Sequence, residues 1–186
     1  MIDVKWILSE IMITQSLGEE CNNEHNAFME QAIVLAKKAA SLGEVPIGAV
    51  IVHNGLVIAQ AINTRESQQD ATGHAEIAAI RQACRTLGSW RLCECDLYVT
   101  LEPCLMCSGA IIQARVRHLY FGAYDPKSGM AGSVFDTFAL PSNHRVLVTG
   151  GILEACCGDL IRSFFIKRRN TLSFTDNTNC ENDKNK

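Results

Sequence analysis

Four stretches of the chain carry a helical pattern of apolar and polar positions. In the first, apolar residues such as Phe28, Ile33 and Ala39 recur at helical spacing, and Gly43 follows as a stop signal. The last begins near Gly151 and ends in a run of basic residues. The predicted helices cover residues 24–42, 74–87, 103–114 and 151–169.

Shorter runs rich in β-branched residues predict strands. Residues 46–52 form a nearly continuous run of this kind, and Asn54-Gly55 is a strong signal for a two-residue hairpin, so residues 56–62 should return antiparallel. Further strands are predicted at residues 96–101, 116–121 and 145–149, with loops at 64–72 and 122–133. Strands that alternate with helices after an initial hairpin predict an α/β sandwich with a mixed sheet.

The length and the charge distribution narrow the class of protein. A chain of 186 residues with 47% hydrophobic residues is long enough for one domain with a real core. The net charge of −3 argues against a broadly basic nucleic-acid binder, but residues 1–30 carry −5 and residues 31–170 carry +3. We therefore expect an N-terminal extension at 1–23, a folded domain at 24–170 and a polar tail at 171–186.

The nine cysteines cannot all form internal pairs, because their number is odd. No export signal is visible, and no apolar run approaches the about 18 residues of a membrane span. We therefore expect a cytoplasmic protein without a membrane segment, in which cysteines serve metal binding or packing rather than disulfides. Packing or incidental exposure is expected for Cys21, Cys84, Cys93, Cys95, Cys156, Cys157 and Cys180.

Two short motifs carry the candidate chemistry. His74-Ala75-Glu76 opens one predicted helix, and Pro103-Cys104-Leu105-Met106-Cys107 opens the next. Cys104 and Cys107 share one face of the first helical turn, where the helix N-terminus favours the thiolate form. One imidazole and two thiolates are three zinc ligands, and a fourth position left to water is the pattern of a catalytic zinc site.

Glu76 stands two residues from the candidate ligand His74 and suggests a reaction. Zinc pulls the pKa of a bound water toward neutrality, and a nearby carboxylate can take that proton and return it to a leaving amine. Ala75 keeps the helix start slim, so that a substrate can approach the backbone. This arrangement is the H-x-E…P-C-x-x-C signature of zinc deaminases.

Each motif alone also has a plainer interpretation. A single histidine on an apolar helix is usually a core or surface residue, and a single C-x-x-C pair in a cytosolic chain serves packing or redox chemistry as readily as metal binding. The two motifs occur together here, each at the start of a helix and each with an accessory residue, Glu76 or Pro103. The combination favours a catalytic metal site.

With these motifs in place, the chain over about residues 26–170 resembles the cytidine/deoxycytidylate deaminase superfamily, and within it the bacterial tRNA-specific adenosine deaminases. The resemblance rests on Glu44 to Val50, Asn63, His74 to Glu76, Thr100 to Cys107, Phe121 to Ala123, Asp125, Lys127, Gly129, Ala131 to Ser133, Asn143 to Val146, Gly151 to Leu153 and Phe164-Phe165. One departure is Gly73, where such enzymes usually have alanine before the histidine, and it is expected to loosen the helix start slightly.

The resemblance implies a three-layer α/β/α sandwich with a mixed five-stranded sheet, cytidine deaminase-like. It implies that His74, Cys104 and Cys107 hold one Zn²⁺ per subunit and that Glu76 shuttles protons. Asn63 would hold the flipped nucleoside, the loop of Asp125 would flank the substrate strand, and Val45 and Ala75 would contact the substrate. It also implies a homodimer whose active site borrows residues from the partner.

Basic and aromatic residues near the end of the last predicted helix suggest where RNA could bind. The cluster consists of Arg162, Phe164, Phe165, Lys167, Arg168 and Arg169. Aromatic rings beside cations suit stacking on splayed bases and contact with phosphates, and Phe165 and Arg168 are our candidate contacts. The alternative is a solvated helix end, where cations are favoured in any case.

On this resemblance, the leading hypothesis is hydrolytic deamination of adenosine to inosine at wobble position 34 of tRNA. The substrate would be chiefly an arginine tRNA with an ACG anticodon, and the partner would be its anticodon stem-loop. Its rival is a deaminase of a free base or nucleotide, such as guanine or deoxycytidylate, which would use the same four site residues. A third hypothesis is a non-catalytic RNA-binding module with structural zinc. Glu76 weighs against it, because a structural site has no use for that carboxylate.

Overall fold

The computed structural model describes residues 24–179, with side chains described up to residue 170. The expected extension at 1–23, with Cys21, and the end of the tail, with Cys180, lie outside the described residues. None of the helices in the described range is long and apolar enough to cross a membrane.

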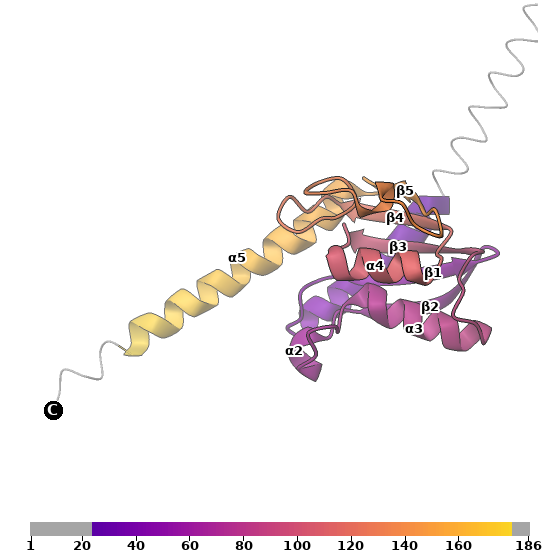
Figure 1. Ribbon diagram of the computed structural model, residues 1–186. Coiled ribbons are helices and arrows are strands. Elements are labelled where there is room, and N and C mark those ends of the chain that lie inside the picture. The colour runs from indigo at the N-terminus through magenta and orange to yellow at the C-terminus, as the bar shows by residue number, and fades with distance from the viewer. Residues whose placement is uncertain (1–23, 180–186) are drawn as a thin grey trace, which may run out of the picture.

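A mixed sheet of five strands forms the centre of the fold (Figure 1). Its strands are β1 (Gly48–His53), β2 (Leu56–Ile62), β3 (Cys95–Leu101), β4 (His118–Ala123) and β5 (Leu147–Thr149), in the order β2-β1-β3-β4-β5. β1 pairs antiparallel with β2 and β3, whereas β3, β4 and β5 run parallel. The predicted mixed five-stranded sheet is therefore confirmed.

The first two strands form the hairpin predicted from Asn54-Gly55. Both residues have positive φ, 50° and 73°, and His53 pairs with Leu56 across the turn. Such a pair of left-handed residues is typical of the tight turn that matches the twist of two strands. A bulge between Ile51 and Val52 shifts the register before the turn.

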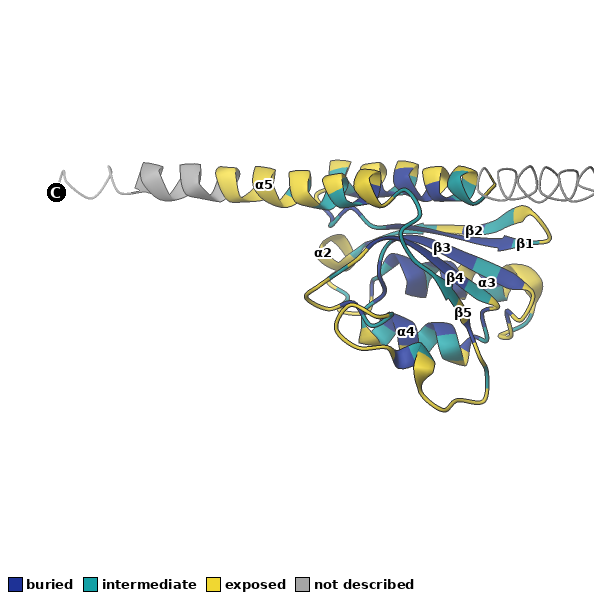
Figure 2. Ribbon diagram, turned by 90° about the horizontal axis from the view of Figure 1, so that it is seen from above, coloured by how far each residue is buried: buried dark blue, intermediate teal, exposed yellow. Residues whose placement is uncertain are grey.

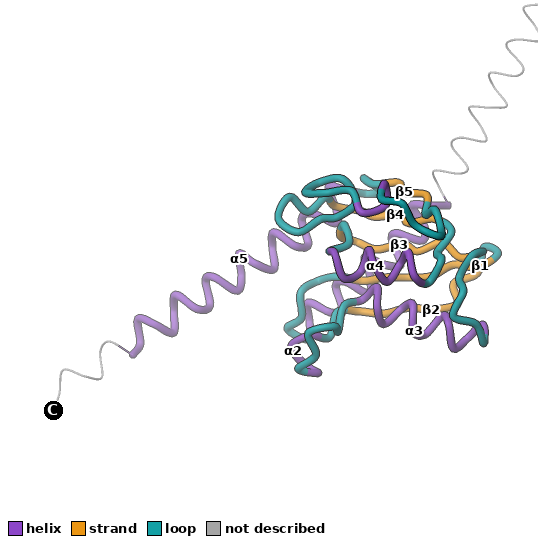
Figure 3. The backbone as a smooth tube through the Cα atoms, in the orientation of Figure 1, coloured by secondary structure: helices purple, strands orange, loops and turns teal. Residues whose placement is uncertain are grey.

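Helices cover both faces of the sheet, as Figures 2 and 3 show. One face packs against α3 (Ala75–Leu87) and α4 (Leu105–Gln113), and the other against the helical residues 24–41 and α5 (Glu154–Asn179). Side chains alternate accordingly along β3, where Leu97 and Val99 join the core under α3 and α4 while Tyr98 joins the opposite core. This is the expected three-layer α/β/α sandwich.

Most predicted boundaries shift by one to three residues, and two differences from the sequence predictions are larger. The expected loop at 64–72 contains a short helix, α2 (Arg65–Gln68), which the side chain of Glu44 helps to hold. α5 continues to Asn179, past residue 169 where the pattern ended it, and projects beyond the sheet (Figure 1). A 3-10 turn, η1 (Thr137–Ala139), lies before β5.

Candidate functional site

The two motifs meet because the helices that carry them start side by side at the same end of the sheet. α3 and α4 pack against one face of the sheet, and β3 leads directly into the turn before α4. His74 and Cys104 are the extended residues that precede the first turns of α3 and α4. Ligands commonly bind outside the carboxyl ends of parallel strands in such folds.

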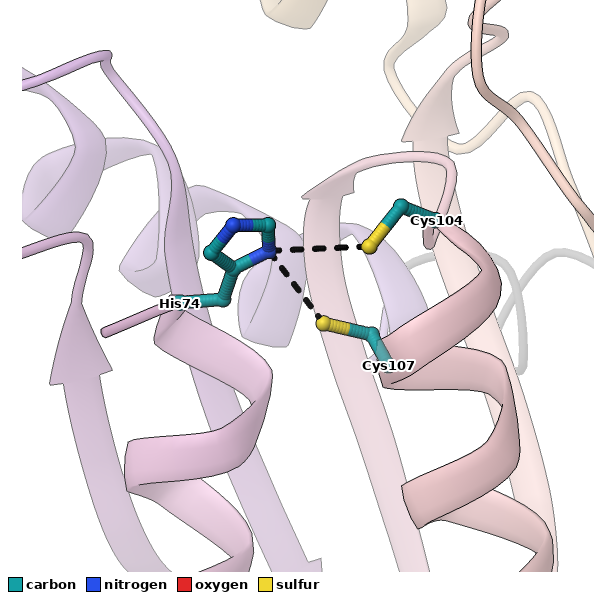
Figure 4. Close-up of side chains that lie close together, drawn as sticks. All are labelled: His74, Cys104 and Cys107. Atoms are coloured by element: carbon teal, nitrogen blue, oxygen red, sulfur yellow. Dashed lines mark hydrogen bonds between the residues drawn. The ribbon is translucent and has the colours of Figure 1, made fainter. Parts of the chain in front are cut away.

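His74, Cys104 and Cys107 form a compact group of donor atoms (Figure 4). His74 Nδ1 lies 3.6 Å from Cys104 Sγ and 3.4 Å from Cys107 Sγ. In a tetrahedral zinc site, the Zn–S bond is ~2.3 Å and the Zn–N bond is ~2.0 Å, so a sulfur ligand and a nitrogen ligand lie about 3.5 Å apart. The three side chains therefore fit a metal ion of that kind.

The protonation of the cysteines also fits a metal site. Hydrogen bonds from Cys107 and His74 lower the pKa of the Cys104 thiol to about 4, against the opposing effect of burial. The same partnership with Cys104, together with burial, raises the pKa of Cys107. The surroundings of Cys104 therefore favour its thiolate, the form that binds metals.

Glu76 lies in the first turn of α3 and is only 3% exposed. Burial raises the pKa of its carboxyl group, which the charge of nearby His74 partly offsets. Its Oε2 has no hydrogen-bond partner among the described residues. A buried polar oxygen without a partner is costly, so this atom is available for a water or substrate in the site.

A pocket of about 560 Å³ opens beside this group. His74, Glu76 and Cys104 line it, while Cys107 lies behind them and is fully buried. The volume is within the about 300–1,000 Å³ of small-ligand sites, which is enough for one nucleobase and its sugar.

The structure brings most of the predicted substrate contacts to this pocket. Val45, Asn63, Asp125 and Phe165 all line it, although they come from four separate segments of the chain. Ala75 is buried in α3 and is not part of the lining. Arg168 is exposed on α5 and does not line the pocket either.

Three cationic side chains line the pocket as well, Arg65, Lys127 and Arg162. Arg162 belongs to the basic cluster and Lys127 to the resembling motifs, whereas no pattern in the sequence marks Arg65. It lies in a polar loop whose residues gave no signal of their own. Arg162 also pairs with Asp159 on α5, at 2.5 Å.

Asn63 is held in place by a buried carboxylate. The Nδ2 of Asn63 donates to Glu44 Oε2 at 3.1 Å, and Glu44 Oε1 accepts from the backbone N–H and the hydroxyl of Ser67, both at 2.7 Å. Burial alone would raise the pKa of Glu44, but these hydrogen bonds outweigh it and lower the pKa. With its NH₂ group turned to Glu44, Asn63 keeps its Oδ1 as the acceptor available to the pocket.

Gly73, the departure noted in the sequence, sits in a tight corner. A Cβ at this position would lie 3.1 Å from the backbone oxygen of Asp70 and 3.2 Å from Thr64. The backbone oxygen of Gly73 also accepts a hydrogen bond from the N–H of Thr64 at 2.8 Å. Glycine therefore relieves crowding just before His74.

The other five cysteines in the described part of the chain stay outside the donor group, as expected. Cys95 and Cys157 are buried, Cys84 is half-buried, and Cys93 and Cys156 are exposed. Burial raises the pKa of Cys95 to about 11 and that of Cys157 to about 12, so both are inert thiols. Within the described range, only His74, Cys104 and Cys107 form a group that could hold a metal.

Comparison with known proteins supports the geometry. Residues 23–169 match the family model of the MafB19-like deaminases. A tRNA-specific adenosine deaminase of Bacillus subtilis is 48% identical over 143 residues, which cover 76% of this chain and 89% of the relative. The tRNA-specific adenosine deaminase of Agrobacterium fabrum is 48% identical over 147 residues, which cover 78% of this chain and 97% of the relative.

Solved structures give the same picture. A tRNA:A34 deaminase, studied for A-to-I editing at the wobble position of transfer RNA, is 49% identical with a TM-score of 0.70, covering 72% of this chain and 98% of its own. A guanine deaminase from Nitrosomonas europaea is more distant, with 28% identity and a TM-score of 0.62. The match covers 75% of this chain and 83% of the guanine deaminase chain. On the combined strength of site geometry, identity and coverage, the chain belongs to the tRNA-specific adenosine deaminases of the deaminase superfamily.

Proposed function

We propose that this protein is a zinc-dependent deaminase that converts adenosine to inosine at wobble position 34 of tRNA, chiefly an arginine tRNA with an ACG anticodon. The observation that carries the proposal is the unpartnered Glu76 Oε2 beside the donor group of His74, Cys104 and Cys107 in one pocket. The similarity to proteins named tRNA-specific adenosine deaminase supports the substrate.

His74, Cys104 and Cys107 would hold the zinc ion. When bound, zinc acts as a Lewis acid that makes water a potent nucleophile at neutral pH. Of these residues, His74 and Cys104 line the pocket, where the base would lie. The overall reaction adds water at C6 of adenine and releases ammonia.

Glu76 would move the protons. Its Oε2 takes a proton from the attacking water and delivers it to the nitrogen that leaves, so one carboxylate serves as base and then as acid. Its burial suits both tasks, because a raised pKa brings the group closer to neutral pH. Asn63 would fix the base through its Oδ1, the amide oxygen not turned to Glu44.

The surroundings of the pocket suit a nucleic acid. Arg65, Lys127 and Arg162 line it and would contact phosphates, and Phe165, 41% exposed, would stack on a splayed base. Val45 and the loop of Asp125 line the pocket and would contact the substrate strand, whereas the buried Ala75 would not. Arg168 lies three residues beyond Phe165 on α5, so it would contact the RNA strand outside the pocket.

We further propose that the deaminase domain spans residues 24–170, with an N-terminal extension at 1–23 and a polar tail at 171–186, and that the protein acts in the cytoplasm as a homodimer. The family match over residues 23–169 supports these domain limits. Exposed apolar side chains near the start of α4 and in the segment before η1, Leu105, Val134 and Phe135, would suit a subunit contact.

Deamination of a free base is the second candidate, because the guanine deaminase of Nitrosomonas europaea shares the fold. Parallel incubation with unmodified arginine tRNA, free guanine and deoxycytidylate separates the two. We expect the protein to release ammonia from the tRNA but not from guanine or deoxycytidylate. Turnover of guanine or deoxycytidylate with unchanged tRNA would assign the rival function instead.

A further inference from the structure

Glu102 is a buried carboxylate between β3 and the first cysteine of the donor group. It is 2% exposed and stands two residues before Cys104. Its N–H donates to the backbone oxygen of Ala123 at 2.9 Å, which fixes its main chain against the end of β4. The position of Glu102 is therefore set by the same sheet edge that sets the position of Cys104.

The side chain of Glu102 accepts four hydrogen bonds, all from residues 124–133, which we call the pocket loop. Oε1 accepts from the N–H groups of Ala131, at 2.8 Å, and Ser133, at 3.0 Å. Oε2 accepts from the N–H of Asp125, at 3.0 Å, and from the hydroxyl of Ser133. A carboxylate offers about four acceptor positions, so Glu102 has none left for a substrate or a proton relay.

The pocket loop is closely fitted around this carboxylate. A Cβ at Gly129 would lie 2.3 Å from Glu102 Oε2, so only glycine allows the loop to pass so near. The N–H of Met130 donates to the backbone oxygen of Pro103 at 2.9 Å, a second tie to the turn that carries Cys104. Both ties connect the loop to the metal-ligand turn rather than to the rest of the surface.

The first half of the loop forms a wall of the pocket. Tyr124, Asp125, Pro126, Lys127 and Ser128 all line it. Within this wall the carboxylate of Asp125 accepts from the N–H of Lys127 at 2.9 Å and from the hydroxyl of Ser128 at 2.6 Å. Glu102 therefore holds the base of a segment whose tip faces the substrate.

We infer that Glu102 is a positioning residue that sets the pocket loop at a fixed distance from the metal ligands, so that the loop receives an RNA strand. The inference rests on the proposed function for its substrate. Glu102 acts through the loop and not on the reacting atoms. Loss of its acceptors weakens the capture of RNA while the metal site and the chemical step persist.

Glu102→Gln is the sharpest variant, because it keeps the size of the side chain but puts an NH₂ group where two loop donors need an acceptor. Losing these acceptors leaves loop donors unpaired and loosens the loop, so we expect about a tenfold rise in KM for an anticodon stem-loop, which corresponds to about 1.4 kcal/mol. We expect kcat to stay within about twofold, because the ligands and Glu76 are untouched. Glu94→Gln is the matched control, since the side chain of Glu94 is exposed and pairs with Arg117 at 3.9 Å, away from the pocket loop.

Trypsin supplies a readout that does not depend on activity. Lys127 is exposed within the pocket loop, so cleavage after it reports how firmly the loop is held. We expect Glu102→Gln to be cut there about tenfold faster than the wild type or Glu94→Gln, at equal zinc content. If Glu102→Gln fails to fold, Ser133→Ala takes its place, because it removes only the hydroxyl bond to Glu102. We expect Ser133→Ala to raise the KM for the stem-loop and the rate of cleavage after Lys127 about threefold each.

Wild-type KM and wild-type cleavage in Glu102→Gln, or in Ser133→Ala where the first does not fold, would overturn the inference. A fall in kcat with unchanged cleavage would also overturn it, by assigning Glu102 to the chemical step. If the wild type itself leaves the stem-loop unchanged, the proposed function fails, while the cleavage rates still decide whether Glu102 holds the loop.

Discussion

His74 Nδ1 lies 3.4 Å from Cys107 Sγ, although the two residues are 33 positions apart and belong to the starts of different helices. The pair meets because α3 and α4 pack side by side on one face of the sheet and begin at the same edge. The distance matches two neighbouring ligands of one tetrahedral zinc ion. The active centre is therefore assembled by the fold from two local motifs.

Glu76→Gln should separate metal binding from catalysis. The amide keeps the shape of the side chain but cannot accept and return a proton, so we expect full zinc content and a loss of about 10²- to 10⁴-fold in kcat. Zinc is measured by elemental analysis and turnover by inosine formation. Full activity in this variant would show that the assigned proton carrier is wrong.

Removal of the metal should abolish turnover reversibly. A chelator should eliminate inosine formation, and added Zn²⁺ should restore it, because His74, Cys104 and Cys107 remain in place. Cobalt substitution offers a spectroscopic check, since thiolate ligands give an intense charge-transfer band in the near ultraviolet. That band should weaken in Cys104→Ser, and its persistence would remove Cys104 from the ligand set.

Local motifs explain why the donor group could be predicted from the sequence. Cys104 and Cys107 are one helical turn apart, so their spacing predicts that both thiols share one helix face. Glu76 follows the ligand His74 by two residues, which marks it as a candidate proton carrier beside the metal. The strands could be predicted from the sequence as well, because the period of the apolar residues indicates which face of an element is buried. Leu97, Tyr98 and Val99 follow that alternation in the structure.

Long-range partners explain what the sequence did not predict. Glu44 and Glu102 accept hydrogen bonds from backbone groups 22 to 31 residues away, and no residue pattern marks such donors. Arg65 lines the pocket from α2, a helix whose Glu66 and Ser67 donate backbone hydrogen bonds to the distant Glu44. α5 extends to Asn179 because the chain after Gly158 contains no glycine or proline that would end it, although its composition is polar.

Glu44→Gln should impair catalysis through Asn63. The glutamine amide cannot accept at both of its terminal atoms, so the bonds from Asn63 or from Ser67 are lost. We expect a destabilisation of about 1–3 kcal/mol and a fall in kcat/KM of about tenfold, because the amide of Asn63 is no longer fixed. Glu66→Gln is the control, since its exposed side chain lies outside this network; an equal loss in both would exclude the proposed role of Glu44.

The stability should fall as the pH drops below neutrality, in part through His118. This ring stacks on Tyr120 at 4.0 Å and contacts Thr149 Oγ1 at 2.9 Å. Burial lowers the pKa of His118, with Asp96 opposing the shift and His25 and Arg117 adding to it.

The unfolded chain thus binds the proton more readily than the folded one, and stability is lost as the pH falls through about 6.5 and below. His118→Gln removes this contribution, so its melting temperature should fall less than that of the wild type between about pH 7.5 and 5.5. Thermal unfolding at both values measures the difference. Parallel pH profiles for the two proteins would contradict the assignment.

Wobble-position deamination is tested most directly by sequencing an unmodified arginine tRNA with an ACG anticodon after incubation with the zinc-loaded protein. We expect inosine at position 34 and at no other adenosine of that tRNA, and no inosine with Glu76→Gln. An unchanged adenosine at position 34, together with release of ammonia from guanine or deoxycytidylate, would contradict it.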